Sequence, residues 1–156
     1  MDAAGQGTAV AGVSHLSDAP IIDWEAFQAS RSELGADFIR ILGYFREDGS
    51  KSVTAIETAM RAGQAVALIT PAHTLKGEAR QFGADSLAEL AEGIEDFARK
   101  CVEYRQTPDE IIPEAAKLRP LFEETMAAFD AETNPLVERR GFGKKALVTN
   151  QGFGRI

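Results

Sequence analysis

Apolar residues recur every three or four positions over most of the chain between residues 37 and 129, which is the spacing of one face of an α-helix. The first stripe follows Asp37 and comprises Phe38, Ile41, Leu42, Phe45, Val53, Ile56 and Met60. Asp48-Gly49-Ser50 has the composition of a break, yet positions 45, 49 and 53 are four apart, so the stripe continues in phase. We therefore expect one long helix, bent at Gly49, that ends at Gly63.

Two further helical patterns follow. The central one runs from about Gln64 to Phe82, and Gly83 is placed to cap its C-terminus. Pro71 lies inside it and should bend it, because proline removes one backbone hydrogen bond. Ser86-Leu87-Ala88-Glu89 is a capping-box sequence and predicts the start of the next helix. The apolar stripe of that helix is Leu87, Leu90, Ile94, Phe97, Cys101 and Tyr104.

The last helix has two start signals. Thr107-Pro108-Asp109-Glu110 is typical of a helix start, and Pro113 indicates that this turn is short and that the main helix begins there. The main helix should bend at Pro120 and end at Asn134-Pro135. Its stripe is Leu118, Leu121, Phe122, Thr125 and Phe129.

Four long amphipathic helices with short connections predict an all-α fold, an antiparallel up-and-down four-helix bundle. A short extra helix, capped by Asp23 and running through Phe27, should precede it. Residues 30–37 then form either a turn around Gly35 or the ragged start of the next helix.

We divide the chain into a flexible N-terminal arm (1–20), the bundle (21–134) and a basic C-terminal tail (135–156) that contains Gly-Phe-Gly twice. A disordered solubilising segment is the favoured interpretation of the tail. The alternative is a segment that touches a partner or the acidic bundle.

Composition argues against several classes of protein. The chain has 156 residues and a net charge of −7, which argues against a nucleic-acid-binding protein. The single cysteine, Cys101, excludes an internal disulfide and falls on an apolar stripe, so we expect a packed core thiol. Neither an apolar run of membrane-spanning length nor a signal-peptide pattern occurs, so we expect a cytoplasmic protein without a membrane partner.

The candidate chemistry lies in the central helix, at one of only two histidines in the chain. Lys76, Gly77 and Arg80 lie within about 60° of His73 on a helical wheel. A neutral imidazole is a competent nucleophile toward a phosphoryl group, and the two cations could offset phosphate charge. Glycine within a helix lowers stability by about 1 kcal/mol relative to alanine, and the close approach of a partner would explain why Gly77 is present. The plainer alternative is a solvated surface histidine, as we expect for His15 in the arm.

His73-Thr74-Leu75-Lys76-Gly77, followed by Phe82-Gly83-Ala84, resembles the signature of histidine-containing phosphotransfer (HPt) domains. The resemblance spans roughly residues 21–129 and includes an upstream Asp37, Leu42, Phe45 pattern and a downstream Leu90, Ile94-Glu95 pattern. One departure is Glu78, where the family more often has a small residue.

The resemblance implies a phosphorelay intermediate. His73 would accept a phosphoryl group from the aspartate of a receiver domain and pass it to another receiver, with Lys76, Gly77 and Arg80 completing the site. The implied partners are receiver domains of response regulators and of a hybrid histidine kinase, and we expect a monomer without cofactor or metal of its own. Because the chain lacks a glycine-rich nucleotide loop, self-phosphorylation from ATP is not expected.

Two alternative functions remain open on the sequence. A module of the same fold could sequester a receiver domain without phosphotransfer, although the presence of His73, Lys76 and Gly77 together argues against it. A metal-dependent or hydrolytic enzyme that uses His73 is disfavoured, because no further histidine, cysteine or carboxylate pair lies at ligand spacing on the same face.

Overall fold

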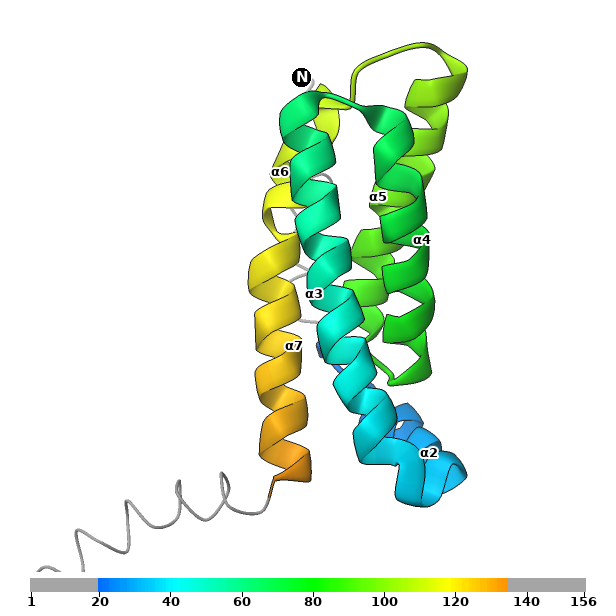
Figure 1. Cartoon of the computed structure of the whole chain (residues 1–156), viewed down its shortest axis with the longest axis vertical. Helices are drawn as coiled ribbons and strands as arrows, with labels where there is room; N and C mark the ends of the chain where they lie inside the picture. The colour runs from blue at the N-terminus through cyan, green and yellow to red at the C-terminus, as the bar shows by residue number, and fades with distance from the viewer. Residues whose placement is uncertain (1–19, 135–156) are drawn as a thin grey trace, which may run out of the picture.

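The chain folds into four long helices whose neighbours run antiparallel, with a short helix packed at one end (Figure 1). The structure is a computed structural model and describes residues 20–134. Its helices are α2 (Trp24–Leu34), α3 (Phe38–Ala62), α4 (Ala65–Gln81), α5 (Asp85–Glu103), α6 (Ile112–Ala116) and α7 (Leu118–Thr133), with 3₁₀ turns at Gly35–Asp37 and Asp109–Ile111. The predicted all-α four-helix bundle is confirmed. Apart from Pro20, the expected N-terminal arm and the C-terminal tail lie outside the described residues.

Glycines end α3 and α4 where the sequence predicted. Gly63 has φ = 64°, and its N–H bonds back to the carbonyls of Ala59 and Met60. Gly83 has φ = 74°, a left-handed conformation that side chains disfavour. A Cβ at Gly83 would also lie 2.4 Å from the carbonyl oxygen of Asp23. This tight turn is the whole connection between α4 and α5, so it sets the register of the two helices that carry the candidate site.

Gly49 has a packing role that the expected bend did not anticipate. It lies inside α3, which continues without interruption through Asp48-Gly49-Ser50. A Cβ at this position would lie 2.5 Å from Cε1 of Phe122 on α7, closer than carbon atoms approach without a clash. The absent side chain therefore lets the Phe122 ring pack against the α3 backbone.

Three predicted boundaries are wrong. Helix α2 extends past Phe27 to Leu34, and the 3₁₀ turn at Gly35–Asp37 separates it from α3. Helix α5 begins at Asp85 without a side-chain cap. The hydroxyl of Ser86, predicted to cap this helix, instead donates to the carbonyl of Pro20 at 3.4 Å.

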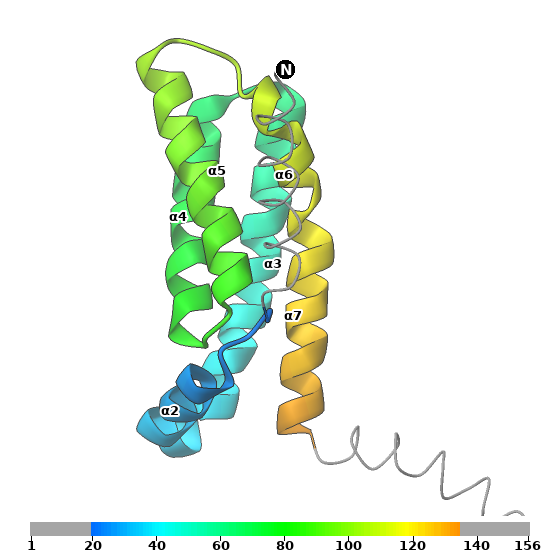
Figure 2. The ribbon, with the colours of Figure 1, turned by 180° about the vertical axis from the view of Figure 1, so that it is seen from behind.

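The third wrong boundary concerns the last helix, which was predicted to run from Pro113 with a bend at Pro120. The chain instead breaks at Lys117 into α6 and α7. The break places Pro120 in the first turn of α7, where a missing N–H costs no helical hydrogen bond. Figure 2 shows α6 and α7 following the connection that crosses the end of the bundle from α5.

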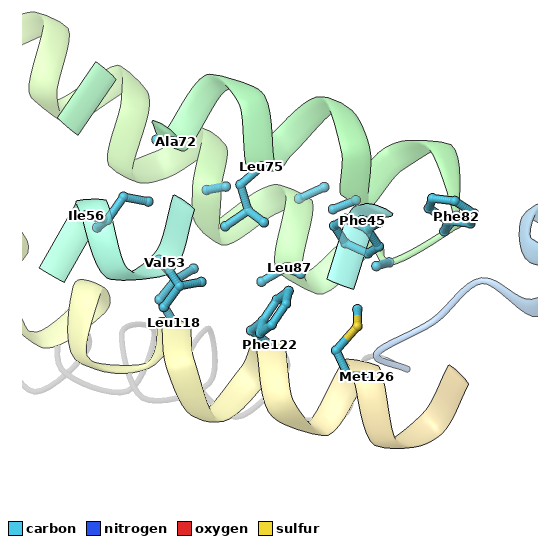
Figure 3. Packing of buried hydrophobic residues seen from close by; sticks show 14 of the residues in the cluster. Phe45, Val53, Ile56, Ala72, Leu75, Phe82, Leu87, Leu118, Phe122 and Met126 are labelled. Atoms are coloured by element: carbon cyan, nitrogen blue, oxygen red, sulfur yellow. The ribbon is translucent and has the colours of Figure 1, made fainter. Parts of the chain in front are cut away.

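All four long helices contribute side chains to one core (Figure 3). Its fully buried aromatic members are Phe27, Phe38, Phe45, Phe82 and Phe129. Burial of each such side chain contributes about 1.5–3 kcal/mol. Cys101 is buried, as predicted, whereas Tyr104 lies beyond the end of α5 and is 65% exposed. Within residues 20–134 we find no helix long and apolar enough to cross a membrane.

Candidate phosphotransfer site

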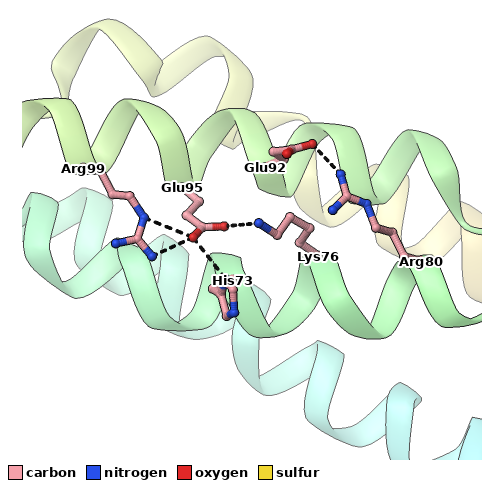
Figure 4. Close-up of polar contacts among 6 residues, drawn as sticks. All are labelled: His73, Lys76, Arg80, Glu92, Glu95 and Arg99. Atoms are coloured by element: carbon pink, nitrogen blue, oxygen red, sulfur yellow. Dashed lines mark hydrogen bonds and ion pairs between the residues drawn. The ribbon is translucent and has the colours of Figure 1, made fainter.

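His73 lies in the middle of α4, on the side that faces α5 (Figure 4). Its side chain is 62% exposed, so a partner can reach the ring. The ring atom Nδ1 lies 3.0 Å from Oε2 of Glu95 on α5. Helix α4 therefore supplies the imidazole, and α5 fixes the ring from one side.

Glu95 is the hub of the site. The residue is only 3% exposed, and donors from two helices surround its carboxylate. Lys76 Nζ lies 2.7 Å from Oε1, whereas Arg99 donates through Nε and Nη2 to Oε2 at 3.1 and 2.8 Å. With His73 as a third partner, the buried negative charge is compensated, as a charge in this environment must be.

These contacts determine the protonation state of Glu95. Burial alone would raise the pKa of the carboxyl, but the hydrogen bonds from Lys76, Arg99 and His73 outweigh it and lower the pKa from 4.5 to about 2. Glu95 is therefore ionised at neutral pH, and an ionised carboxylate only accepts hydrogen bonds.

The tautomer of His73 follows from this charge. Because Glu95 can only accept, Nδ1 must carry the proton of the neutral ring, and the lone pair then lies on Nε2. The exposed ring is thus held with one nitrogen occupied by protein and the other available as a nucleophile.

The sequence did not reveal this hub. The downstream pattern of the resemblance includes Glu95 without giving it a role, and it does not include Arg99. One signal was available: Glu95 lies among the buried positions Ala91, Ile94 and Ala98 of α5, where an acidic residue needs cationic partners. Arg99 follows it by four residues, which is the spacing of an ion pair within a helix.

The other predicted site residues divide into two groups. Lys76 joins His73 at Glu95, and its side chain is only 16% exposed because it turns toward that carboxylate. Arg80 pairs instead with Glu92 of α5, one turn before Glu95. The structure therefore brings Lys76 into the cluster and leaves Arg80 in a separate, more exposed pair.

Gly77 leaves open space beside His73. A Cβ added to it would meet nothing within 4 Å, and its backbone does not adopt the positive φ angle that favours glycine. Neither backbone conformation nor internal packing explains the residue. The surface next to the imidazole is consequently bare, as the access argument from sequence requires.

Glu78 faces away from this cluster, toward α3. Its Oε1 atom is buried and has no hydrogen-bond partner within the described part of the chain. Burial, and secondarily the charge of Asp48 on α3, raise the pKa of Glu78. The residue that departs from the family pattern therefore carries an electrostatic cost in the fold.

The exposed His73, the buried Glu95 and Lys76 all lie within a segment of the chain that matches a known protein family. The model of the Hpt domain family matches residues 40–132, more than half of the chain. The chain belongs to the Hpt domain family, and it is a phosphotransfer relay module.

A solved structure agrees with this assignment. The histidine-containing phosphotransfer protein B (HptB) from Pseudomonas aeruginosa PAO1 is similar in fold, with a TM-score of 0.51 and 25% sequence identity. The match covers 69% of this chain and 96% of that protein. The comparison with curated proteins found no match.

Proposed function

We propose that His73 accepts a phosphoryl group from the aspartyl phosphate of a receiver domain and passes it to the aspartate of another receiver domain. The observation that carries this proposal is the contact of His73 Nδ1 with the ionised, buried Glu95. It leaves Nε2 as the exposed nucleophile on a surface that Gly77 keeps open.

The transfer step conserves atoms and charge. The Nε2 lone pair forms a bond to phosphorus, the bond from phosphorus to the aspartyl oxygen breaks, and its electron pair leaves with the receiver's carboxylate. The ring keeps its Nδ1 proton and becomes positively charged. Glu95 accepts the hydrogen bond from that proton, so its negative charge stabilises the ring as charge develops. Donation to the second receiver is the same step in reverse.

Lys76 and Arg99 have a second role in this proposal. Both cations lie within hydrogen-bonding distance of Glu95, so a phosphoryl group on the neighbouring ring would lie beside a cluster in which two positive charges outweigh one negative charge. Cationic donors of this kind stabilise phosphate oxygens. Arg80 is engaged with Glu92 and is expected to contribute less.

The test is transfer from a phosphorylated receiver. A receiver domain encoded in the same genome is labelled with acetyl phosphate and Mg²⁺ and then mixed with the full chain. We expect an acid-labile, alkali-stable label on the chain, its loss in His73→Gln, and its retention in His15→Gln, a matched change of the other histidine.

Two results contradict the proposal. Equal labelling of His73→Gln and the parent chain would show that His73 is not the phosphorylated residue. Stable binding of the phosphorylated receiver without any label on the chain would instead favour a module that sequesters receivers.

A further inference from the structure

Two exposed valines lie beside the candidate site. The contact of His73 with Glu95 shows which residues of the antiparallel helices α4 and α5 lie at the same level. Seven residues before His73 is Val66, and seven residues after Glu95 is Val102. Seven residues are about two helical turns, so each valine shares the face of its reference residue and lies about 10 Å away along the axis. The two valines therefore face each other at one level of the bundle.

Both side chains are open to solvent: Val66 is 67% exposed and Val102 is 43% exposed. Between them and the site lies Ile69, which is partly buried and packs against the core. On α4 the apolar surface thus continues from Val66 to the neighbourhood of His73, whereas on α5 the half-exposed Arg99 lies between Val102 and Glu95. On the other side of His73 along the same two helices, the Arg80–Glu92 ion pair occupies the surface. The site consequently has an apolar border along α4 on one side and an ionic border on the other.

We infer that Val66 and Val102 form an apolar docking contact for the receiver domain that reacts with His73. This inference rests on the proposed function and adds the place where the receiver sits. A standard interface covers about 800 Å² on each partner, a disc about 16 Å in radius, whereas the valines lie about 10 Å along the axis from the ring. A receiver centred on Nε2 therefore reaches them. The receiver would place an apolar side chain, at the edge of its phosphorylation site, against the two valines.

A second copy of this chain is a less suitable occupant. Two valines expose far less than the roughly 1,200 Å² in total that a stable interface needs. The contact is useful only as part of a larger footprint, and docking on His73 provides that footprint. With one apolar and one ionic border, the surface also favours a single orientation of the receiver, because an apolar contact and a charge pair are not interchangeable.

The test is Val66→Asp, with Ile112→Asp as its matched control. Both residues lie in the first turn of a helix, where an acid is tolerated, and Ile112 is 53% exposed on α6. Three quantities are measured for each full-length variant: transfer from the phosphorylated receiver at several receiver concentrations, labelling by phosphoramidate, and the thermal transition. Phosphoramidate is a small phosphoryl donor that needs no docking surface.

We expect Val66→Asp to lower the efficiency of transfer from the receiver about tenfold, through a higher half-saturating receiver concentration, because the interface must bury an unpaired charge. Labelling by phosphoramidate and the thermal transition should match the parent chain, and Ile112→Asp should transfer normally.

Four outcomes overturn the inference. Unchanged transfer in Val66→Asp would exclude the contact while leaving the proposed function intact, whereas equal losses with receiver and phosphoramidate would show damage to the site itself. Sedimentation that finds a parent dimer and a Val66→Asp monomer would assign the patch to a second copy. If the parent chain accepts no label from any receiver, the proposed function fails and the docking contact fails with it.

Discussion

Replacement of Glu95 by glutamine should cost stability at neutral pH and progressively less in acid. The change keeps the size of the side chain but removes the charge that Lys76, Arg99 and His73 surround. Because the pKa falls from 4.5 to about 2 on folding, ionised Glu95 stabilises the native state by about 3 kcal/mol at pH 7. A carboxyl with a lowered pKa contributes this stability above pH 4.5 and loses it as the pH falls toward 2.

Urea unfolding followed by circular dichroism measures this effect. The free energy of unfolding of Glu95→Gln should lie about 3 kcal/mol below that of the parent chain at pH 7, and the gap should shrink to about 1 kcal/mol at pH 3. Glu89→Gln, an exposed change on the same helix, should stay within about 0.5 kcal/mol of the parent at both values. A gap for Glu95→Gln that is the same at pH 7 and pH 3 would refute the electrostatic account of the hub.

Three further predictions concern α4. Gly77→Gln should gain up to about 1 kcal/mol of stability yet slow transfer by filling the open space beside the ring; a stable and fully active variant would contradict the access argument. Glu78→Gln should raise the melting temperature at pH 7, because the raised pKa penalises the ionised form, and the gain should disappear in acid, where the parent residue is protonated; a gain that persists there would have another cause. Lys76→Ala should slow transfer and shorten the lifetime of the label more than Arg80→Ala does. Equal lifetimes in both variants would contradict the larger role assigned to Lys76.

Helix positions were predictable because they depend on local spacing. Because the apolar stripe keeps its phase across Asp48-Gly49-Ser50, α3 was correctly predicted to continue through these residues. Gly63 and Gly83 marked helix ends because few other residues adopt their positive φ angles. The failures depend on partners distant in sequence. The Ser86 hydroxyl bonds Pro20 across 66 residues, so a local capping pattern was misleading.

The candidate site was predictable only in part for the same reason. His73, Lys76 and Gly77 share a face of one helix, which a helical wheel reveals. The acceptor for the ring is on α5, and its position depends on the register that the turn at Gly83 imposes on the two helices. Helical spacing alone does not give that register, so the sequence predicts neither the role of Glu95 nor that of Arg99.

The most direct test of the account is the identity of the phosphorylated atom. The chain is labelled with ¹⁵N in its histidines, phosphorylated by a receiver domain, and examined by NMR for phosphorus coupling to each ring nitrogen. The account predicts a phosphoryl group on Nε2 of His73, with Nδ1 still protonated and directed to Glu95. A phosphoryl group on Nδ1, or on any residue other than His73, would contradict it.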